Sequence, residues 1–215
     1  MKKLIISLLL LLSFNSTSYS QSNNKIAIDS DHLLPLRPAF GVFKKHDQKI
    51  QSILFNGISD FQFTQFLTYG AESVLVIELD TSNISNPYFS IVYHKCKSSI
   101  WTSLIYKDSK EIIVEKFRKP ISKIDATKIA DLYSAALSKV CESNRTGIDG
   151  NSYQFATMTH AGTAWIAGKP NAENKVDRLV LLNKELIELI KNDQETFSLN
   201  GELSMKIEKL TQEFN

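Results

Sequence analysis

The chain has 215 residues, with 25 lysines and arginines against 23 aspartates and glutamates. Lys2 and Lys3 are the only charged residues among the first twenty, so the charges cancel over the rest of the chain. Without a basic excess, the chain lacks the attraction that drives sequence-independent binding to nucleic acid or to an anionic membrane surface. We therefore expect neither as a partner.

The first twenty residues have the pattern of a secretory signal peptide. A positively charged start is followed by an apolar run over residues 4–12 and then by small polar residues. The run is about half as long as a helix that spans a bilayer, and the small residues Ser18 and Ser20 favour cleavage between Ser20 and Gln21. We expect a periplasmic or secreted protein that has no stable membrane anchor after cleavage.

The rest of the chain is long enough for one domain that buries roughly 70% of the surface exposed by the unfolded chain. Residues 21–34 begin with a polar stretch without periodicity, which predicts a flexible N-terminal arm. No linker rich in glycine, proline or serine and no internal repeat interrupts residues 35–215, which we expect to form a single globular domain.

Residues 40–69 are rich in phenylalanine but follow neither the helical nor the strand period for long. Phe61 and Phe63 fit a strand, whereas residues 60–67 also fit a short helix. Two hypotheses for the aromatic side chains stay open: they fill the core, or they form an aromatic groove for a ligand or partner. The candidates for that groove are Phe55, Phe61, Phe63 and Phe66.

Four strands are predicted next, at residues 72–79, 88–96, 99–106 and 111–117, from their β-branched and aromatic content. The first of them has apolar residues at odd and even positions alike, which predicts burial on both faces. Short polar connections between consecutive strands favour an antiparallel meander.

A helix is predicted after this meander. Ser122 and Asp125 have the spacing of a capping box. The apolar residues from Ile129 to Val140 then recur with the helical period and form one buried stripe.

A β-hairpin is predicted at residues 147–165. Asp149-Gly150 is a turn pair, aromatic residues follow at alternate positions, and Gly162 marks a second turn. We expect Tyr153 and Phe155 to pack on the same face of the sheet as the aromatic residues before them.

Two more helices are predicted from apolar residues at helical spacing, at residues 176–190 and 202–214. The apolar stripe of the first is wide, so we expect the second to cover it. The order strands, helix, hairpin, helix, helix predicts an α+β fold: an antiparallel sheet (meander plus C-terminal hairpin) with two to three helices packed on one face.

The two cysteines are expected to form a disulfide. An even number of cysteines in an exported chain favours pairing, and Cys141 continues the helical column of Tyr133 and Leu137 toward the sheet, where Cys96 ends a strand. Such a bond would stabilise the fold by about 4 kcal/mol. It would also remove Cys96 as a nucleophile for His94, and a catalytic pair would still lack an orienting third group.

Asp149, Ser152 and His160 place an acid, a hydroxyl and a histidine within twelve residues. A triad is defined by geometry rather than by proximity in sequence, and no Gly-x-Ser-x-Gly elbow is present. We predict no catalytic residue, and we find no spacing typical of a metal site or of a cofactor motif.

Residues 118–190 resemble a loose pattern of small uncharacterised bacterial envelope proteins. The matching residues are Pro120 and Ser122, the turn Gly147-Ile148-Asp149-Gly150, the hairpin residues Tyr153, Phe155 and Trp165, and the run Arg178-Leu179-Val180. The resemblance implies a strand, a capped helix, an aromatic hairpin and a leucine-rich helix in that order, and it implies no activity. In many such proteins a proline follows the tryptophan closely, whereas here residues 166–169 separate Trp165 from Pro170.

Two functions are consistent with these features. The first is a non-enzymatic periplasmic protein that binds another envelope protein, of the inhibitor or immunity type. The alternative is a hydrolase with a site near His160, Asp149 and Ser152.

Overall fold

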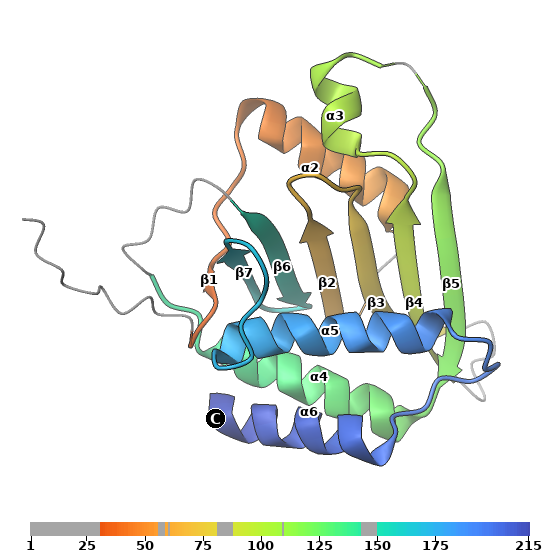
Figure 1. Ribbon diagram of the computed structural model, residues 1–215, viewed down its shortest axis with the longest axis vertical. Coiled ribbons are helices and arrows are strands. Elements are labelled where there is room, and N and C mark those ends of the chain that lie inside the picture. Colours follow the sequence, from red (N-terminus) through yellow and green to blue (C-terminus); the bar gives the residue numbers. More distant parts are fainter. Residues whose placement is uncertain (1–30, 56–58, 60, 81–87, 109, 143–149) are drawn as a thin grey trace, which may run out of the picture.

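The computed structural model describes residues 31–55, 59, 61–80, 88–108, 110–142 and 150–215. These residues form a seven-stranded antiparallel sheet with helices on both faces (Figure 1). The strands are β1 (Leu34–Pro35), β2 (Phe61–Phe66), β3 (Ser73–Asp80), β4 (Tyr88–Cys96), β5 (Val114–Ile121), β6 (Asn151–Thr157) and β7 (Ala161–Ile166), in the spatial order β1-β7-β6-β2-β3-β4-β5. The helices are α2 (Gly41–Leu54), α3 (Ile100–Ile105), α4 (Lys123–Ser138), α5 (Lys175–Lys191) and α6 (Gly201–Phe214).

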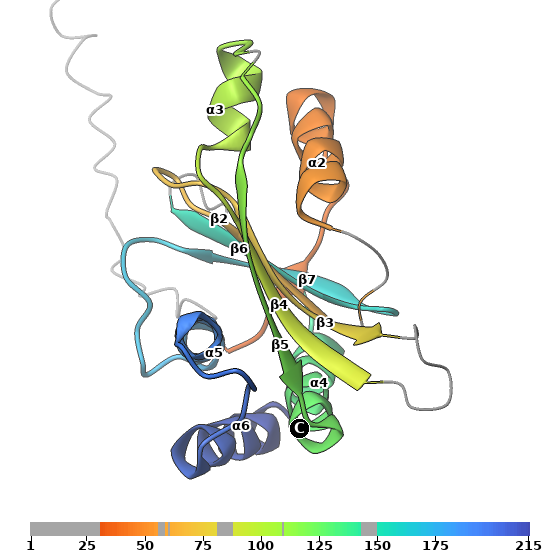
Figure 2. The same ribbon diagram turned by 90° about the vertical axis from the view of Figure 1, so that its right-hand side faces the viewer.

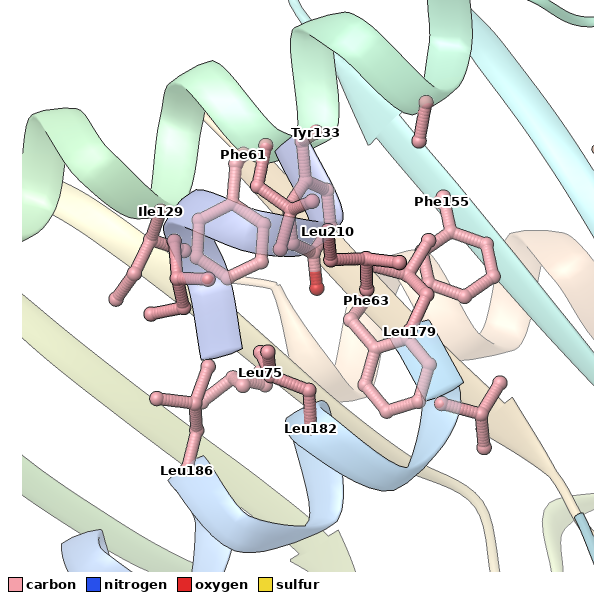
Figure 3. Close-up of a cluster of buried hydrophobic side chains, with 14 of the residues drawn as sticks. Phe61, Phe63, Leu75, Ile129, Tyr133, Phe155, Leu179, Leu182, Leu186 and Leu210 are labelled. Atoms are coloured by element: carbon pink, nitrogen blue, oxygen red, sulfur yellow. The ribbon is translucent and has the colours of Figure 1, made fainter. Parts of the chain in front are cut away.

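The main core lies between one face of the sheet and helices α4 and α5 (Figures 2 and 3). Side chains alternate along a strand, and this face carries four fully buried aromatic residues: Phe61, Phe63, Tyr153 and Phe155. The ring centroids of Tyr133 on α4 and Phe61 lie 4.1 Å apart. Helix α6 packs against the outer side of α4 and α5. The predicted α+β fold is therefore confirmed.

Helices α2 and α3 cover the opposite face of the sheet (Figure 2). They bury a second, smaller cluster in which Ile50 and Leu54 of α2 and Ile100 of α3 contact Val74 and Val76 of β3. The prediction of burial on both faces of residues 72–79 is thus confirmed. The three predicted helices are α4, α5 and α6, which lie on one side of the sheet as expected. Helices α2 and α3 on the other side were not predicted. Residues 41–54 do follow the helical period, but the phenylalanine-rich segment 40–69 also contains strand β2, so neither period holds over the whole segment.

Residues 99–106 were predicted to be a strand and instead contain the short helix α3. Ser99 is its N-cap and accepts a hydrogen bond from the backbone N–H of Thr102. The first backbone N–H groups of the helix bind the carboxylate of Glu72, which precedes β3. The helix is therefore stabilised by a residue distant in sequence, and local propensity did not indicate it.

The predicted hairpin is present as β6 and β7, and the predicted helix after Ser122 is α4, with Ser122 accepting from the backbone N–H of Asp125. Gly162, however, lies within β7 and not at a turn. A Cβ atom there would come within 2.9 Å of Val140 and 3.1 Å of Leu33. Glycine is therefore required by close packing, because the chain before β1 and the end of α4 lie against this strand.

The predicted disulfide is absent, because Cys96 and Cys141 are both free thiols. Cys96 lies in the cluster beneath α2 and α3, whereas Cys141 follows α4 on the other side of the sheet and is exposed. The prediction extended the helical column by one turn, but α4 ends at Ser138. The backbone N–H of Cys141 instead donates to the carbonyl of Leu33, next to β1.

The globular domain begins slightly earlier than residue 35. Leu33 is fully buried in the main core, and Leu34 pairs with Thr163 of β7. The predicted signal peptide and the first part of the predicted arm, residues 1–30, lie outside the described residues. None of the helices in the described ranges is long and apolar enough to cross a membrane.

Candidate functional site

Helix α2 and helix α3 project beyond the strands at the same end of the molecule (Figures 1 and 2). Their inner ends are held by the small cluster of buried residues, and their outer ends carry aromatic side chains. This end of the molecule is the strongest candidate for a functional surface. The two helices are held together there by a buried carboxylate.

Glu72 is 2% exposed and accepts four hydrogen bonds. The donors are the backbone N–H groups of Ile100 at 2.7 Å and Trp101 at 2.9 Å, the hydroxyl of Ser99 at 3.2 Å and Nε2 of His46 at 2.8 Å. Burial raises the pKa of this carboxyl, but the hydrogen bonds from His46 and from the two backbone N–H groups outweigh it, so the pKa is lowered from its usual value. Glu72 is therefore ionised at neutral pH, and its negative charge offsets the partial positive charge at the N-terminus of α3.

His46 links α2 to this carboxylate. A carboxylate oxygen only accepts, so Nε2 of His46 carries a proton and donates it. The ring also makes edge contacts with Phe66, at 5.8 Å between ring centroids, and with Trp101, at 5.3 Å. Helices α2 and α3 are thus joined through Glu72 and Trp101.

His94, another buried polar residue of this face, also satisfies a helix end. Nδ1 of His94 donates to the carbonyl of Leu54, the last residue of α2, at 2.8 Å. Such a carbonyl has no partner within its own helix. The role of His94 is therefore structural, as it is for Lys119 on the other face, whose Nζ donates to the carbonyls of Leu189 and Asn192 at the end of α5.

Cys96 has no properties of a catalytic nucleophile. It is fully buried, and burial together with the nearby Glu72 carboxylate raises the pKa of its thiol to about 12. A nucleophilic cysteine requires the thiolate, which Cys96 does not form at neutral pH. In addition, the described residues include no group of three His, Cys, Asp or Glu side chains placed to hold a metal ion.

The exposed aromatic residues gather around one ring pair. The rings of Phe43 on α2 and Trp101 on α3 stack at 5.0 Å between centroids and 22° between planes. On the same two helices, Phe43 is 60% exposed, Ile105 is 47% exposed and Tyr106 is 78% exposed. Phe40, just before α2, is 78% exposed and lines a shallow hollow with Lys44 and Asp47. We call Phe40, Phe43, Trp101, Ile105 and Tyr106 the α2–α3 surface.

The α2–α3 surface lies in a basic environment, although the chain as a whole is almost neutral. Residues 36–55 and 97–113, which contain α2 and α3 with their flanks, have seven lysines and arginines against three acidic residues. Lys44 and Lys45 directly follow Phe43, and Lys107 directly follows Tyr106. Two of the seven cations, Arg37 and Lys97, pair with Glu142 and Glu115, so Lys44, Lys45 and Lys107 are the lysines that flank the exposed rings in sequence.

The aromatic residues proposed from the sequence are not the exposed ones. Phe61 and Phe63 are fully buried in the main core, so the hypothesis that they fill the core is confirmed for both. Phe55 and Phe66 are partly buried against the cluster beneath α2. None of the four belongs to the α2–α3 surface.

The reason is visible in the helix itself. Phe43 lies on the same helical stripe as the buried residues His46, Ile50 and Leu54. The stripe is longer than the sheet beneath it, so its first turn extends past the strands and meets α3. A helical period in residues 41–54 would have indicated the stripe, but only the position of α3 shows which part stays exposed.

The proposed cluster of Asp149, Ser152 and His160 is not brought together in the described residues. Ser152 lies near the start of β6, whereas His160 lies in the turn after its other end. Thr157 lies five positions after Ser152 along the extended strand, a length of about 17 Å. Nδ1 of His160 lies 2.7 Å from the hydroxyl of its neighbour Thr159, and Asp149 lies outside the described residues.

No protein-family model, curated protein or solved structure matches this chain. The resemblance of residues 118–190 to small bacterial envelope proteins therefore stays a prediction, although the elements that it implies occur in the expected order as β5, α4, the β6–β7 hairpin and α5.

Proposed function

We propose that the protein is an exported, non-enzymatic binding domain that contacts another envelope protein through the α2–α3 surface. The observation that carries the proposal is the group of strongly exposed aromatic and aliphatic side chains around the Phe43–Trp101 stack. Contiguous exposed apolar residues rimmed by polar ones are typical of protein interaction sites. Tryptophan, tyrosine and phenylalanine are also enriched at the centres of such interfaces.

The rigidity of this surface supports binding further. Trp101 lies next to the N-terminal contact of α3 with Glu72, and Phe43 lies one turn before His46. Because both helices are held by buried hydrogen bonds, little conformational freedom is lost when a partner docks. An inhibitor or an immunity-type protein presents a preformed surface of this kind.

The charge around the surface indicates the character of the partner. Lys44, Lys45 and Lys107 flank the exposed rings. A partner with an apolar pocket and an acidic rim complements this arrangement, and such rim charges act mainly on the association rate and its salt dependence. We therefore expect capture of the partner to weaken as the salt concentration rises.

The test is affinity purification of the mature protein from an envelope extract, with two matched double variants. F40A/Y106A removes two exposed rings of the surface. I124A/M205A removes two side chains of similar exposure, 71% for Ile124 and 64% for Met205, on α4 and α6. Neither pair is buried, so both variants are expected to fold.

We expect the wild type and I124A/M205A to recover the same protein, and F40A/Y106A to lose at least about tenfold in affinity, as for interface hot spots. Equal recovery by F40A/Y106A would contradict the proposed surface. Co-sedimentation with vesicles of anionic phospholipid provides a second readout. Binding to such vesicles that depends on Phe40 and Tyr106 would assign the surface to a membrane instead of a protein.

A further inference from the structure

A second feature, separate from the α2–α3 surface, is a polar hollow on the same face of the sheet. Its volume is about 280 Å³, close to the lower end of ligand pockets in proteins. Asp47 and Gln51 of α2 form one wall, and β2 and β6 form the floor. Residues 36–39, which lead into α2, line it from the side. We call this hollow the sheet groove.

The floor of the groove carries three hydrogen-bonding side chains beside the ring of Phe66. Gln62 and Thr64 lie two residues apart on β2 and so point to the same face, and Thr64 pairs directly with Gln154 of β6. On the main-core face the neighbouring positions of both strands are aromatic. Gln62, Thr64 and Gln154 thus lie on the face that α2 only partly covers.

Much of this hydrogen-bonding capacity is unused within the described residues. The amide of Gln62 donates to the hydroxyl of Thr64 at 3.2 Å. The side-chain amides of Gln51 and Gln154, however, have no hydrogen bond to any other described residue. Each amide offers donors and an acceptor, and both line the same hollow.

Asp47 adds a carboxylate to the wall. It is partly buried and forms no ion pair with any described lysine or arginine. Burial raises the pKa of its carboxyl, and the neighbouring His46 lowers it to a smaller extent. A partly desolvated carboxylate in a hollow, without a cationic partner, is a frequent feature of binding sites.

The lining chemistry limits the class of ligand. An anion is disfavoured by Asp47, and the basic lining residue, Arg37, already donates to Glu142 at 2.8 Å. An apolar ligand would leave the amides and the carboxylate without partners, which is costly. A neutral polyhydroxylated ligand matches the lining, because its hydroxyl groups donate to Asp47 and exchange hydrogen bonds with the amides.

We propose that the sheet groove binds a neutral sugar unit, with Asp47, Gln51 and Gln154 contacting its hydroxyl groups. The ring of Phe66 also lines the groove and offers an apolar surface to the C–H groups of the sugar. The volume of the groove is suited to a single sugar ring. This site is independent of the α2–α3 surface, so either proposal can fail without the other.

The test is NMR titration of the isotope-labelled protein with glucose, galactose and N-acetylglucosamine. We expect at least one of them to cause saturable shifts in the backbone amide signals of Gln51, Gln62, Thr64 and Gln154. Asp47→Asn and Gln154→Leu are each expected to weaken that binding by at least about fivefold, because each removes hydrogen bonds to the sugar. Gln212→Leu is the matched control, since Gln212 is exposed on α6, away from the sheet groove.

Two results would overturn the proposal. One is the absence of saturable shifts at these residues with all three sugars at high millimolar concentration. The other is an equal loss of binding in Gln212→Leu, which would show that the sugar binds outside the groove. The dispersed spectrum of each variant shows whether it has folded.

Discussion

Replacement of Glu72 by glutamine tests the contact that holds the candidate surface in place. The change keeps the shape of the side chain but removes its charge, and it replaces one of two accepting oxygens by an NH₂ group. Oε1 of Glu72 accepts from His46, Ser99 and Trp101, and Oε2 accepts from Ile100. Whichever oxygen is replaced, at least one group that donated to Glu72 then faces the NH₂ group of the glutamine, which is itself a donor.

The expected cost follows from these four hydrogen bonds. A hydrogen bond to a charged group contributes about 1 kcal/mol more than a neutral one, so the loss of the charge is expected to reduce the free energy of unfolding by about 3–4 kcal/mol. That is a large part of the about 5–15 kcal/mol that stabilises a typical domain. Urea unfolding followed by circular dichroism measures the loss, and amide hydrogen exchange shows whether α3 opens first.

The loss of stability caused by Glu72→Gln should also depend on pH. The pKa of Glu72 is lowered in the folded state from its usual value of 4.5, so its contribution is complete above that value. The contribution is lost as the pH falls through the lowered folded-state pKa, and the difference between wild type and Glu72→Gln should narrow there. Glu208→Gln, which alters an exposed ion pair with Lys128, is the control and should leave the stability almost unchanged. A similarly small loss for Glu72→Gln, with unchanged exchange in α3, would refute the role of Glu72.

Two further predictions concern the hairpin and the cysteines. Gly150→Val should destabilise the protein by more than about 2 kcal/mol, because Gly150 has φ +144° and a Cβ atom would lie 2.7 Å from the carbonyl oxygen of Ile166. Gly201→Ala is the control and should not destabilise the protein in this way, because nothing lies within 4 Å of a Cβ atom there. Normal thermal unfolding of Gly150→Val would contradict this packing. Iodoacetamide should modify Cys141 in the native protein, but Cys96 only after unfolding, because Cys96 is fully buried and the pKa of its thiol is raised to about 12. A Cys96–Cys141 disulfide found by mass spectrometry without reduction would contradict the fold.

The sequence predicts those elements whose stability is local. The strands β3 and β4 are rich in β-branched and aromatic residues, the hairpin and helices α4, α5 and α6 each have a clear period, and α4 also has its Ser122 cap. Helix α3 did not follow from its own residues, because its N-terminus is stabilised by Glu72, which is 28 residues before Ile100. The disulfide prediction failed for a related reason. The helical period predicts the direction of a side chain only for residues that lie within the helix.

The candidate site was harder to predict than the fold. A phenylalanine-rich segment is consistent with a core or with a surface, and the four phenylalanines chosen from the sequence are buried or partly buried. Exposure of Phe40 and Phe43 depends on where the sheet ends beneath α2. The clustering of lysines around them depends on the pairing of α2 with α3, which are more than 40 residues apart. No local sequence pattern indicates either the exposure of these phenylalanines or the clustering of the lysines.

The most direct test of the proposed function is amide hydrogen exchange of the protein, free and bound to the partner captured from envelope extract. Binding through the α2–α3 surface should slow exchange in the first turns of α2 and throughout α3, with α5 and α6 unchanged. Slower exchange confined to α5 and α6, with α2 and α3 unaffected, would contradict this proposal.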